Sequence, residues 1–223
     1  MHANGNGTPL TGSGREPVTR DRIGEVALRI LDSAKDESAL TMRLLARELG
    51  VQAPSLYAHV TGVDDVLALV HECINATIDL AVLDDADALA GLRRFAYLYR
   101  EAYRRHHVAA TVIITRSINQ DHALRVYEAV ASCLSRAGVP VAQVMPCMAL
   151  LDTIALGSAI EPFAAGFAEA PASYRARYPA LAEALGRSRR RHLDDDGFLL
   201  GLDAFVDVIQ RLAEPRPGPA AAS

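Results

Sequence analysis

The chain carries apolar side chains at helical spacing along most of its length. Between residues 19 and 32 they recur at i, i+3, i+4, i+7 and i+8, which forms one apolar stripe on a helix. The same period continues in further segments. They cover about 41–49, 53–59, 61–77, 89–105, 121–137, 141–167 and 194–212. This pattern predicts an all-α protein.

The segment Val108–Ser117 fits that pattern least well, because its β-branched residues suit a strand as well as a helix. No second strand-like segment lies near it to pair with. We therefore expect a short buried helix here too.

The short segments 41–49 and 53–59 predict a helix-turn-helix unit. Gly50 lies where a glycine commonly ends a helix, and Pro54 lies in the first turn of the next one, where proline is tolerated. Two short helices joined by a glycine-containing turn are typical of this arrangement. Thr19 is expected to cap the first helix of the chain.

A threonine and an aspartate predict how the fourth helix begins. The spacing Thr61-x-x-Asp64 resembles a capping box, in which two side chains bond the free amides of the first turn. The residues expected on its buried face are Val66, Leu69, Val70, Cys73 and Ile74.

Turn residues and composition divide the chain into a small head and a larger body. Residues 1–18 and 214–223 are rich in small residues and proline and are expected to be a disordered arm and tail. The head is expected at 19–61, a linking helix at 62–78 and the body at 79–213.

Composition and charge narrow the class of protein. Half of the 223 residues are hydrophobic and 22% are charged, which is typical of a soluble globular protein. The formal net charge of −4 and the pI near 6.0 do not indicate a nucleic-acid binder, so any such function must depend on a local surface.

The cysteines and the apolar segments point to the cytoplasm. Cys73, Cys133 and Cys147 are widely spaced, which disfavours a disulfide framework and a cysteine zinc site. Polar or helix-breaking residues interrupt the apolar stretch from Val139 to Ile160, so we expect no membrane span. No secretory signal is visible.

The stretch Leu40–Val60, LTMRLLARELGVQAPSLYAHV, strongly resembles the DNA-binding unit of the tetracycline-repressor (TetR) family. With the flanking helices the resemblance covers about Thr19–Ala76. The stretch Gly197–Leu212 looks like the closing dimerisation helix of the tetracycline-repressor subgroup. The chain is therefore identified as a member of this family.

The resemblance implies a function and partners. Such proteins are homodimers that bind palindromic double-stranded DNA operators, and a small effector bound in the body lowers their DNA affinity. We expect a cytoplasmic, ligand-responsive repressor with a helix-turn-helix head and an effector-binding and dimerisation body. The dimer interface is expected to consist of four helices, two from each protomer at 141–167 and 194–212, with Phe205 and Ile209 in it.

The resemblance also assigns a DNA-contacting surface. Arg43 reaches a base edge or phosphate, and Gln52 is the candidate adenine reader at the start of the recognition helix. Tyr57 and His59 match positions that hold the phosphate backbone. The full set is Thr41, Arg43, Gln52, Ala53, Pro54, Ser55, Tyr57 and His59. The alternatives are a core-edge role for Tyr57, a helix-ending role for His59 and a solvated surface charge for Arg43.

The fourth helix departs from the family pattern. Val63 replaces a lysine that grips phosphate in many members, and Asp64 and Asp65 follow it. Two arginines and one glutamate give residues 41–60 a formal charge of only +1. We expect modest DNA affinity with a shallow salt dependence, helped by arginines near the arm. The alternative function is a helical ligand-binding or interaction protein with weak or lost DNA binding.

The effector is expected to occupy an apolar pocket in the body. Its candidate lining residues are Phe95, Tyr99, Tyr103, Ile114, Thr115, Tyr127, Met148, Asp152 and Phe163. The alternative is that these residues are ordinary core. Aromatic and methionine side chains suit a hydrophobic natural product or a drug-like aromatic.

No cofactor, metal site or enzyme activity is expected. The ionisable residues of the body do not form a metalloprotease motif or a nucleophile elbow. Relative to the tetracycline subgroup, Val112 replaces the histidine beside the metal-chelated drug, although Glu161 is retained. His106 and His107 lie at a helix end, where positive charge is favoured, and this fits better than a metal site.

Overall fold

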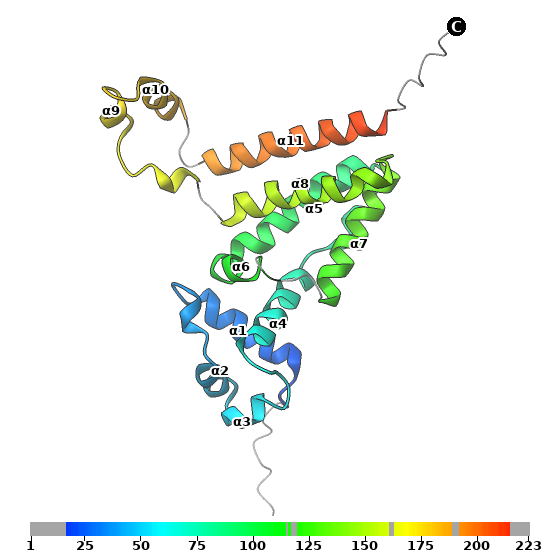
Figure 1. The fold of residues 1–223 in the computed structure, drawn as a ribbon, viewed down its shortest axis with the longest axis vertical. Helices are drawn as coiled ribbons and strands as arrows, with labels where there is room; N and C mark the ends of the chain where they lie inside the picture. Colours follow the sequence, from blue (N-terminus) through cyan, green and yellow to red (C-terminus); the bar gives the residue numbers. More distant parts are fainter. Residues whose placement is uncertain (1–16, 115, 117–119, 161–162, 189–191, 215–223) are drawn as a thin grey trace, which may run out of the picture.

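The computed structural model describes residues 17–114, 116, 120–160, 163–188 and 192–214. Every regular element within these ranges is a helix, as the periodicity predicts. The predicted arm and tail fall almost wholly outside the described residues. A small group of helices lies at one end of the molecule and longer helices form the other end (Figure 1).

The head is built from α1 (Arg20–Asp32), α2 (Met42–Leu49) and α3 (Ala53–Leu56), with the short 3-10 turn η1 (Glu37–Ala39) between the first two. Helix α4 (Val63–Ala76) packs along α1. The apolar stripe of α1 and the inner faces of α2 to α4 form its core. The fully buried side chains there are Ile23, Ala27, Leu31, Leu45, Leu56, Val66, Val70 and Ile74.

The caps that frame the helix-turn-helix unit agree with the prediction. The hydroxyl of Thr19 accepts from the Arg22 amide, and that of Thr41 accepts from the Leu44 amide, both at 3.2 Å. Gly50 has φ of +70°, a left-handed conformation that glycine adopts without steric cost. The turn between α2 and α3 is therefore encoded locally.

The third helix is shorter than predicted. Helix α3 ends at Leu56 instead of His59, and the chain continues in hydrogen-bonded turns. The amides of His59 and Val60 both donate to the Leu56 carbonyl, at 2.9 and 3.0 Å. These turns bury Val60 and bring the chain back to α4.

The predicted capping box at Thr61 and Asp64 is wrong. The N-cap of α4 is Gly62, which makes no side-chain cap bond. The Thr61 amide instead donates to the carboxylate of Asp65 at 3.1 Å. Asp64 points elsewhere because it pairs with Arg116, at 2.7 Å. In the first turn of α4, Asp65 thus bonds the Thr61 amide, while Asp64 forms a long-range ion pair.

The body consists of long helices packed side by side, together with the short helix α6. They are α5 (Ala88–Arg105), α6 (His107–Ile113), α7 (Asp121–Arg136), α8 (Val141–Ile160) and α11 (Leu193–Ala213). Helix α8 packs against α5 on one side and α11 on the other (Figure 1). Two short helices, α9 (Pro171–Tyr174) and α10 (Pro179–Arg187), lie together to one side.

Helix α6 agrees with its prediction, whereas helix α8 is shorter than predicted. Residues 107–113 are helical, so the β-branched segment is a short buried helix as expected, although residues 115 and 117–119 lie outside the described ones. Helix α8 ends at Ile160 instead of 167, and Phe163–Gly166 is a separate 3-10 turn, η3.

Helix α8 is long and apolar enough to span a membrane, by length and composition alone. Core helices of water-soluble bundles meet the same criterion. In this structure α8 contacts α5, α7 and α11. It also contains Pro146, and its Asp152 accepts a hydrogen bond from Tyr127.

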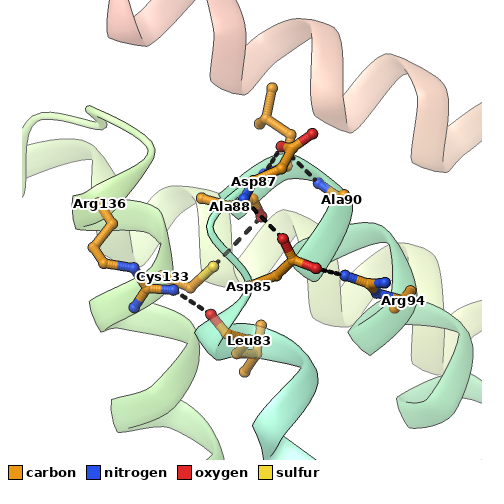
Figure 2. A network of polar contacts seen from close by, with 9 residues as sticks. Leu83, Asp85, Asp87, Ala88, Ala90, Arg94, Cys133 and Arg136 are labelled. Carbon is orange, nitrogen blue, oxygen red and sulfur yellow. Dashed lines mark hydrogen bonds and ion pairs between the residues drawn. The ribbon is translucent and has the colours of Figure 1, made fainter.

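A network of polar contacts holds the joint that leads from α4 into α5 (Figure 2). The joint includes the 3-10 turn η2 (Leu80–Asp84). Arg136 of α7 donates to the Leu83 carbonyl, and Asp85 forms an ion pair with Arg94. Asp87 caps α5, because its carboxylate accepts from the amides of Leu89 and Ala90, at 3.0 and 3.1 Å. The joint is thereby tied to both α5 and α7.

Candidate DNA-binding surface and effector site

The predicted DNA-contacting residues form one exposed surface over α2, α3 and the turn that follows. All except Ala53 and His59, which are half-buried, are exposed. Arg43 forms no ion pair with any other residue that the structure describes, so its guanidinium is available to a partner. Arg47 on the same helix instead pairs with the neighbouring Glu48 at 3.1 Å.

The aromatic ring of Tyr57 lies outside the head core. Its residue is 57% exposed, whereas its neighbour Leu56 is fully buried. This exposure disfavours the alternative of a core-edge aromatic. His59 is held through its backbone, because its carbonyl accepts a hydrogen bond from the Arg20 guanidinium.

The acidic start of α4 is compensated by arginines from other elements. Arg20 of α1 pairs with Asp65 at 2.9 Å, and this contact holds the pKa of the Asp65 carboxyl below its usual range. Arg116, which follows α6, pairs with Asp64. Arg20 is thus engaged within the head, although its side chain remains 49% exposed.

Three predicted effector residues, Phe95, Tyr99 and Tyr103, lie one above the other on α5. The rings of Phe95 and Tyr99 stack with centroids 5.3 Å apart, and Tyr99 meets Tyr103 edge to face at 5.1 Å. All three are buried. They form an aromatic column that runs through the body, which we call the α5 column.

Tyr127 and Asp152 add a polar group beside this column. The Tyr127 hydroxyl donates to the Asp152 carboxylate at 2.6 Å. Burial raises the pKa of Asp152, while its hydrogen bonds from Tyr127 and Tyr99 act in the opposite direction. Burial and the Asp152 carboxylate also raise the pKa of both tyrosines. The body therefore holds a carboxylate bonded by phenols next to aromatic rings.

The remaining predicted effector residues are spread more widely. Met148 is buried on α8, whereas Ile114 and Phe163 are 42% and 65% exposed and do not join the α5 column. Phe163 packs edge to face with Phe167 at 5.3 Å. Thr115 and Glu161 lie outside the described residues. Val112 is buried.

Sequence reasoning missed two buried polar residues on α4. His71 and Asn75 both contact the hydroxyl of Tyr103, at 3.0 and 3.2 Å. Burial lowers the pKa of His71, which keeps its ring neutral. A signal was present, because a polar pair at i and i+4 interrupts the buried face of an amphipathic helix. Such a pair needs a buried partner.

A buried arginine in the body was also missed. Arg100 of α5 donates to the Ser158 hydroxyl at 3.0 Å and pairs with Asp195 at 2.8 Å. Its guanidinium lies over the Phe198 ring, 4.6 Å from the centroid. Arg100 thereby joins α5 to both α8 and α11. Arg100 directly follows Tyr99 and is buried on α5 among mainly apolar side chains.

Among the described residues, no group of three or more histidine, cysteine or acidic side chains is placed to hold a metal ion. His106 instead pairs with Asp32 at 2.9 Å, which links the end of α5 to the end of α1. His107 begins α6 and is exposed.

Comparison with known proteins points to one class. No family model matches the chain. The chain is 27% identical over 236 residues to the HTH-type transcriptional repressor DrrR1 of Streptomyces coeruleorubidus, covering 95% of this chain and 87% of that one. It is 32% identical over 141 residues to an HTH-type transcriptional regulator of Saccharopolyspora erythraea, covering 63% of this chain and 59% of that one.

Solved structures give the same class. Apo ActR of Streptomyces coelicolor superposes with a TM-score of 0.74 at 25% identity, over 90% of this chain and all of that one. ActR, a TetR family protein, in complex with actinorhodin superposes with a TM-score of 0.73 at 26% identity, over 86% and 95% of the two chains.

The fold and the helix-turn-helix surface define an all-helical transcriptional regulator. Within that class, the chain is similar to TetR family proteins of solved structure. This agrees with the family that the sequence of residues 40–60 indicates.

Proposed function

We propose that this protein is a cytoplasmic, homodimeric repressor, released from a palindromic operator by a small aromatic effector. The observation that carries the proposal is the pair of hydrogen bonds that the Tyr103 hydroxyl makes, one with the His71 ring and one donated to the Asn75 side-chain oxygen. They join α4, which follows the helix-turn-helix unit, to the aromatic column of the body. No catalytic step is part of the proposal.

The head is proposed to read DNA through the eight exposed or half-exposed residues of α2, α3 and the following turn. Arg43 is free of ion pairs among the described residues, and arginine commonly binds guanine with two hydrogen bonds. Tyr57 and the His59 turn are suited to contact phosphate, which sets register and carries no sequence information. The proposed boundaries remain 19–61 for the head, 62–78 for the link and 79–213 for the body.

The body is proposed to bind the effector beside the α5 column and the Tyr127–Asp152 pair. Aromatic rings supply shape, while a few polar groups orient the ligand. ActR, which shares the fold, was crystallised with actinorhodin and with (S)-DNPA. By this comparison we assign a hydrophobic natural product or drug-like aromatic to the body, with Phe95, Tyr99, Tyr127, Met148 and Asp152 around it.

Helices α8 and α11 are proposed to pair with their copies in a second protomer. Each presents large apolar side chains to solvent although it is packed in the protomer on its other side. The most exposed are Val141, Met145, Leu199 and Leu200. Burial of this surface favours an isologous two-fold contact. Such a dimer would place the two heads on half-sites about 34–36 Å apart, or a multiple of that spacing.

The residues that we propose for the interface differ from those expected from periodicity. Phe205 and Ile209 are fully buried inside the protomer, so the expectation that they lie in the interface is wrong. Both face the core of the body because they fall on the opposite side of α11 from Leu200.

Transmission to the head is proposed to pass through α4. This helix contacts α1 in the head and α6 and α7 in the body. Its polar contacts with the body include Tyr103 with His71 and Asn75, Glu72 with His122, and Asp64 with Arg116. A ligand that prefers one arrangement of these contacts would shift α4 and the separation of the heads.

The second candidate function is a helical ligand-binding protein with weak or lost DNA binding. Val63 in place of lysine and the 85% exposed Asp64 side chain favour it. A gel shift with the intergenic DNA beside its own gene separates the two. The repressor proposal requires a specific complex that an aromatic effector dissolves, while the alternative requires effector binding without any specific complex.

A further inference from the structure

A groove of about 880 Å³ runs between α1 and α4 and reaches the start of α7. It is separate from the α5 column, which lies inside the body. Leu28 and Leu69 supply its apolar walls, and Cys73 lies in its floor. The two helices approach closely there, since a methyl group added at Gly24 would lie 2.8 Å from the Cys73 sulfur.

The groove has an uncompensated negative rim. Asp21 and Glu25 line it from one face of α1, at i and i+4, and neither pairs with another residue that the structure describes. The other two carboxylates of the groove have polar partners, since Asp65 pairs with Arg20 and Glu72 hydrogen-bonds to the ring and the amide of His122. Two negative charges therefore stand over an apolar surface.

The pKa of the Cys73 thiol is affected by the same two carboxylates. Its pKa is raised to about 11, first by burial and then by the charges of Glu25 and Asp21. A cation bound at the rim would oppose the second effect. Cys73 is partly accessible, whereas Cys133 and Cys147 are buried. It is thus a natural reporter inside the groove.

We propose that this groove binds an amphiphilic organic cation. Its apolar body would lie on Leu28 and Leu69, and its positive group would lie between Asp21 and Glu25. The volume falls within the range of small-molecule sites, roughly 300–1,000 Å³. Because α1 belongs to the head and Gln120 and His122 begin α7, the ligand would contact both parts of the molecule. The inference is independent of the effector site in the body.

The test compares a permanently charged dye with its uncharged analogue. Thioflavin T carries a fixed positive charge on an apolar aromatic frame, and its neutral benzothiazole analogue has nearly the same shape. The full-length protein is titrated with each, and fluorescence is measured at low and high salt. We expect saturable binding of the cation, weaker binding of the neutral analogue, and loss of this preference at high salt.

Variants locate the binding. Asp21→Asn with Glu25→Gln should weaken thioflavin T binding by about fivefold, since each exposed charge contributes modestly. The control, Glu37→Gln with Glu214→Gln, makes the same change in net charge outside the groove and should leave binding unchanged. Asp152→Asn should also leave it unchanged, because that carboxylate lies in the body. Circular dichroism checks that each variant is folded.

A chemical footprint gives a second readout. Alkylation of Cys73 by iodoacetamide at pH 9, followed by peptide mass spectrometry, should change in rate with site occupancy, because the dye covers the thiol and its charge opposes the carboxylates that raise the thiol pKa. The inference is overturned if the dye does not bind saturably, if binding leaves Cys73 alkylation unchanged, or if the Asp21 and Glu25 double variant binds like the control. It is also overturned if Asp152→Asn abolishes binding and the double variant does not.

Discussion

The Arg20 guanidinium, at the start of α1, pairs with the Asp65 carboxylate in the first turn of α4 at 2.9 Å. Arg20 also donates to the carbonyl of His59, in the turn after the recognition helix. One side chain thus ties the first helix of the head to the turn and to the next helix. The orientation of α3 therefore depends on a residue that precedes it by more than thirty positions.

This pair predicts a pH dependence of stability. The pKa of Asp65 is lowered from its ordinary value of 3.8, chiefly by the hydrogen bond from Arg20. A lowered folded-state pKa stabilises the native protein above that ordinary value, and the contribution is lost as the pH falls through the folded-state pKa. Asp65→Asn should cost about 0.5–1 kcal/mol at pH 7 and progressively less in acid. Urea unfolding at several pH values measures it.

Glu48→Gln is a suitable control for that experiment. It removes an exposed pair between neighbours on one helix, Arg47 and Glu48, which ties no two elements together. A cost for Asp65→Asn that is constant down to pH 2 would contradict the role of the charge.

Arg43 is expected to carry sequence discrimination. Arg43→Ala should weaken operator binding by about 1–3 kcal/mol if the guanidinium reads a guanine, and should relax preference at one operator position. Arg47→Ala, on the same helix but paired with Glu48, is the matched comparison. Binding measured against a panel of single-base operator variants distinguishes the two. Equal behaviour of both variants across the panel would refute the assignment.

Tyr57 and His59 are expected to act on the phosphate backbone. Tyr57→Phe or His59→Ala should reduce affinity by a similar factor for operator and unrelated DNA, because phosphate contacts do not depend on sequence. Gel shifts on both DNAs, across a range of salt, provide the measurement. A selective loss on the operator alone would assign these residues to base reading.

The exposed face of α11 is expected to hold the dimer. Leu200→Asp places a charge on a residue that is 73% exposed in the protomer, so it should dissociate the dimer without unfolding the protomer. Phe205→Asp, at a fully buried position, should unfold the body instead. Sedimentation velocity with circular dichroism separates these outcomes. A folded dimer of the Leu200→Asp variant would place the interface elsewhere.

Tyr103 is expected to couple the body to the head. Tyr103→Phe removes the hydroxyl that His71 and Asn75 share and leaves the ring in the α5 column. Unsatisfied buried polar groups cost about 1–3 kcal/mol, so the protein should be less stable but folded. The effector should still bind, while its effect on operator affinity should shrink. Calorimetry for the effector and gel shifts for DNA test this, and an unchanged response would exclude this route.

The sequence by itself determined the longer helices, their order and the helix-turn-helix unit, but it did not predict the short helices α9 and α10. The apolar period, the N-caps Thr19 and Thr41 and the left-handed Gly50 act over a few residues. Local steric and hydrogen-bonding rules govern such features, so they can be predicted from the sequence alone. The string of residues 40–60 also indicated similarity to the TetR family, whose solved structures share this fold.

Only the tertiary structure decided which polar groups meet. Asp64 pairs with Arg116, 52 positions along the chain, and it does not form the local capping box. His71 and Asn75 form hydrogen bonds with the Tyr103 hydroxyl. The packing of α11 on α5 and α8 decides which of its faces is buried and which is exposed. An ion pair or a buried hydrogen bond depends on distances between elements, and helical periodicity contains no information about those distances.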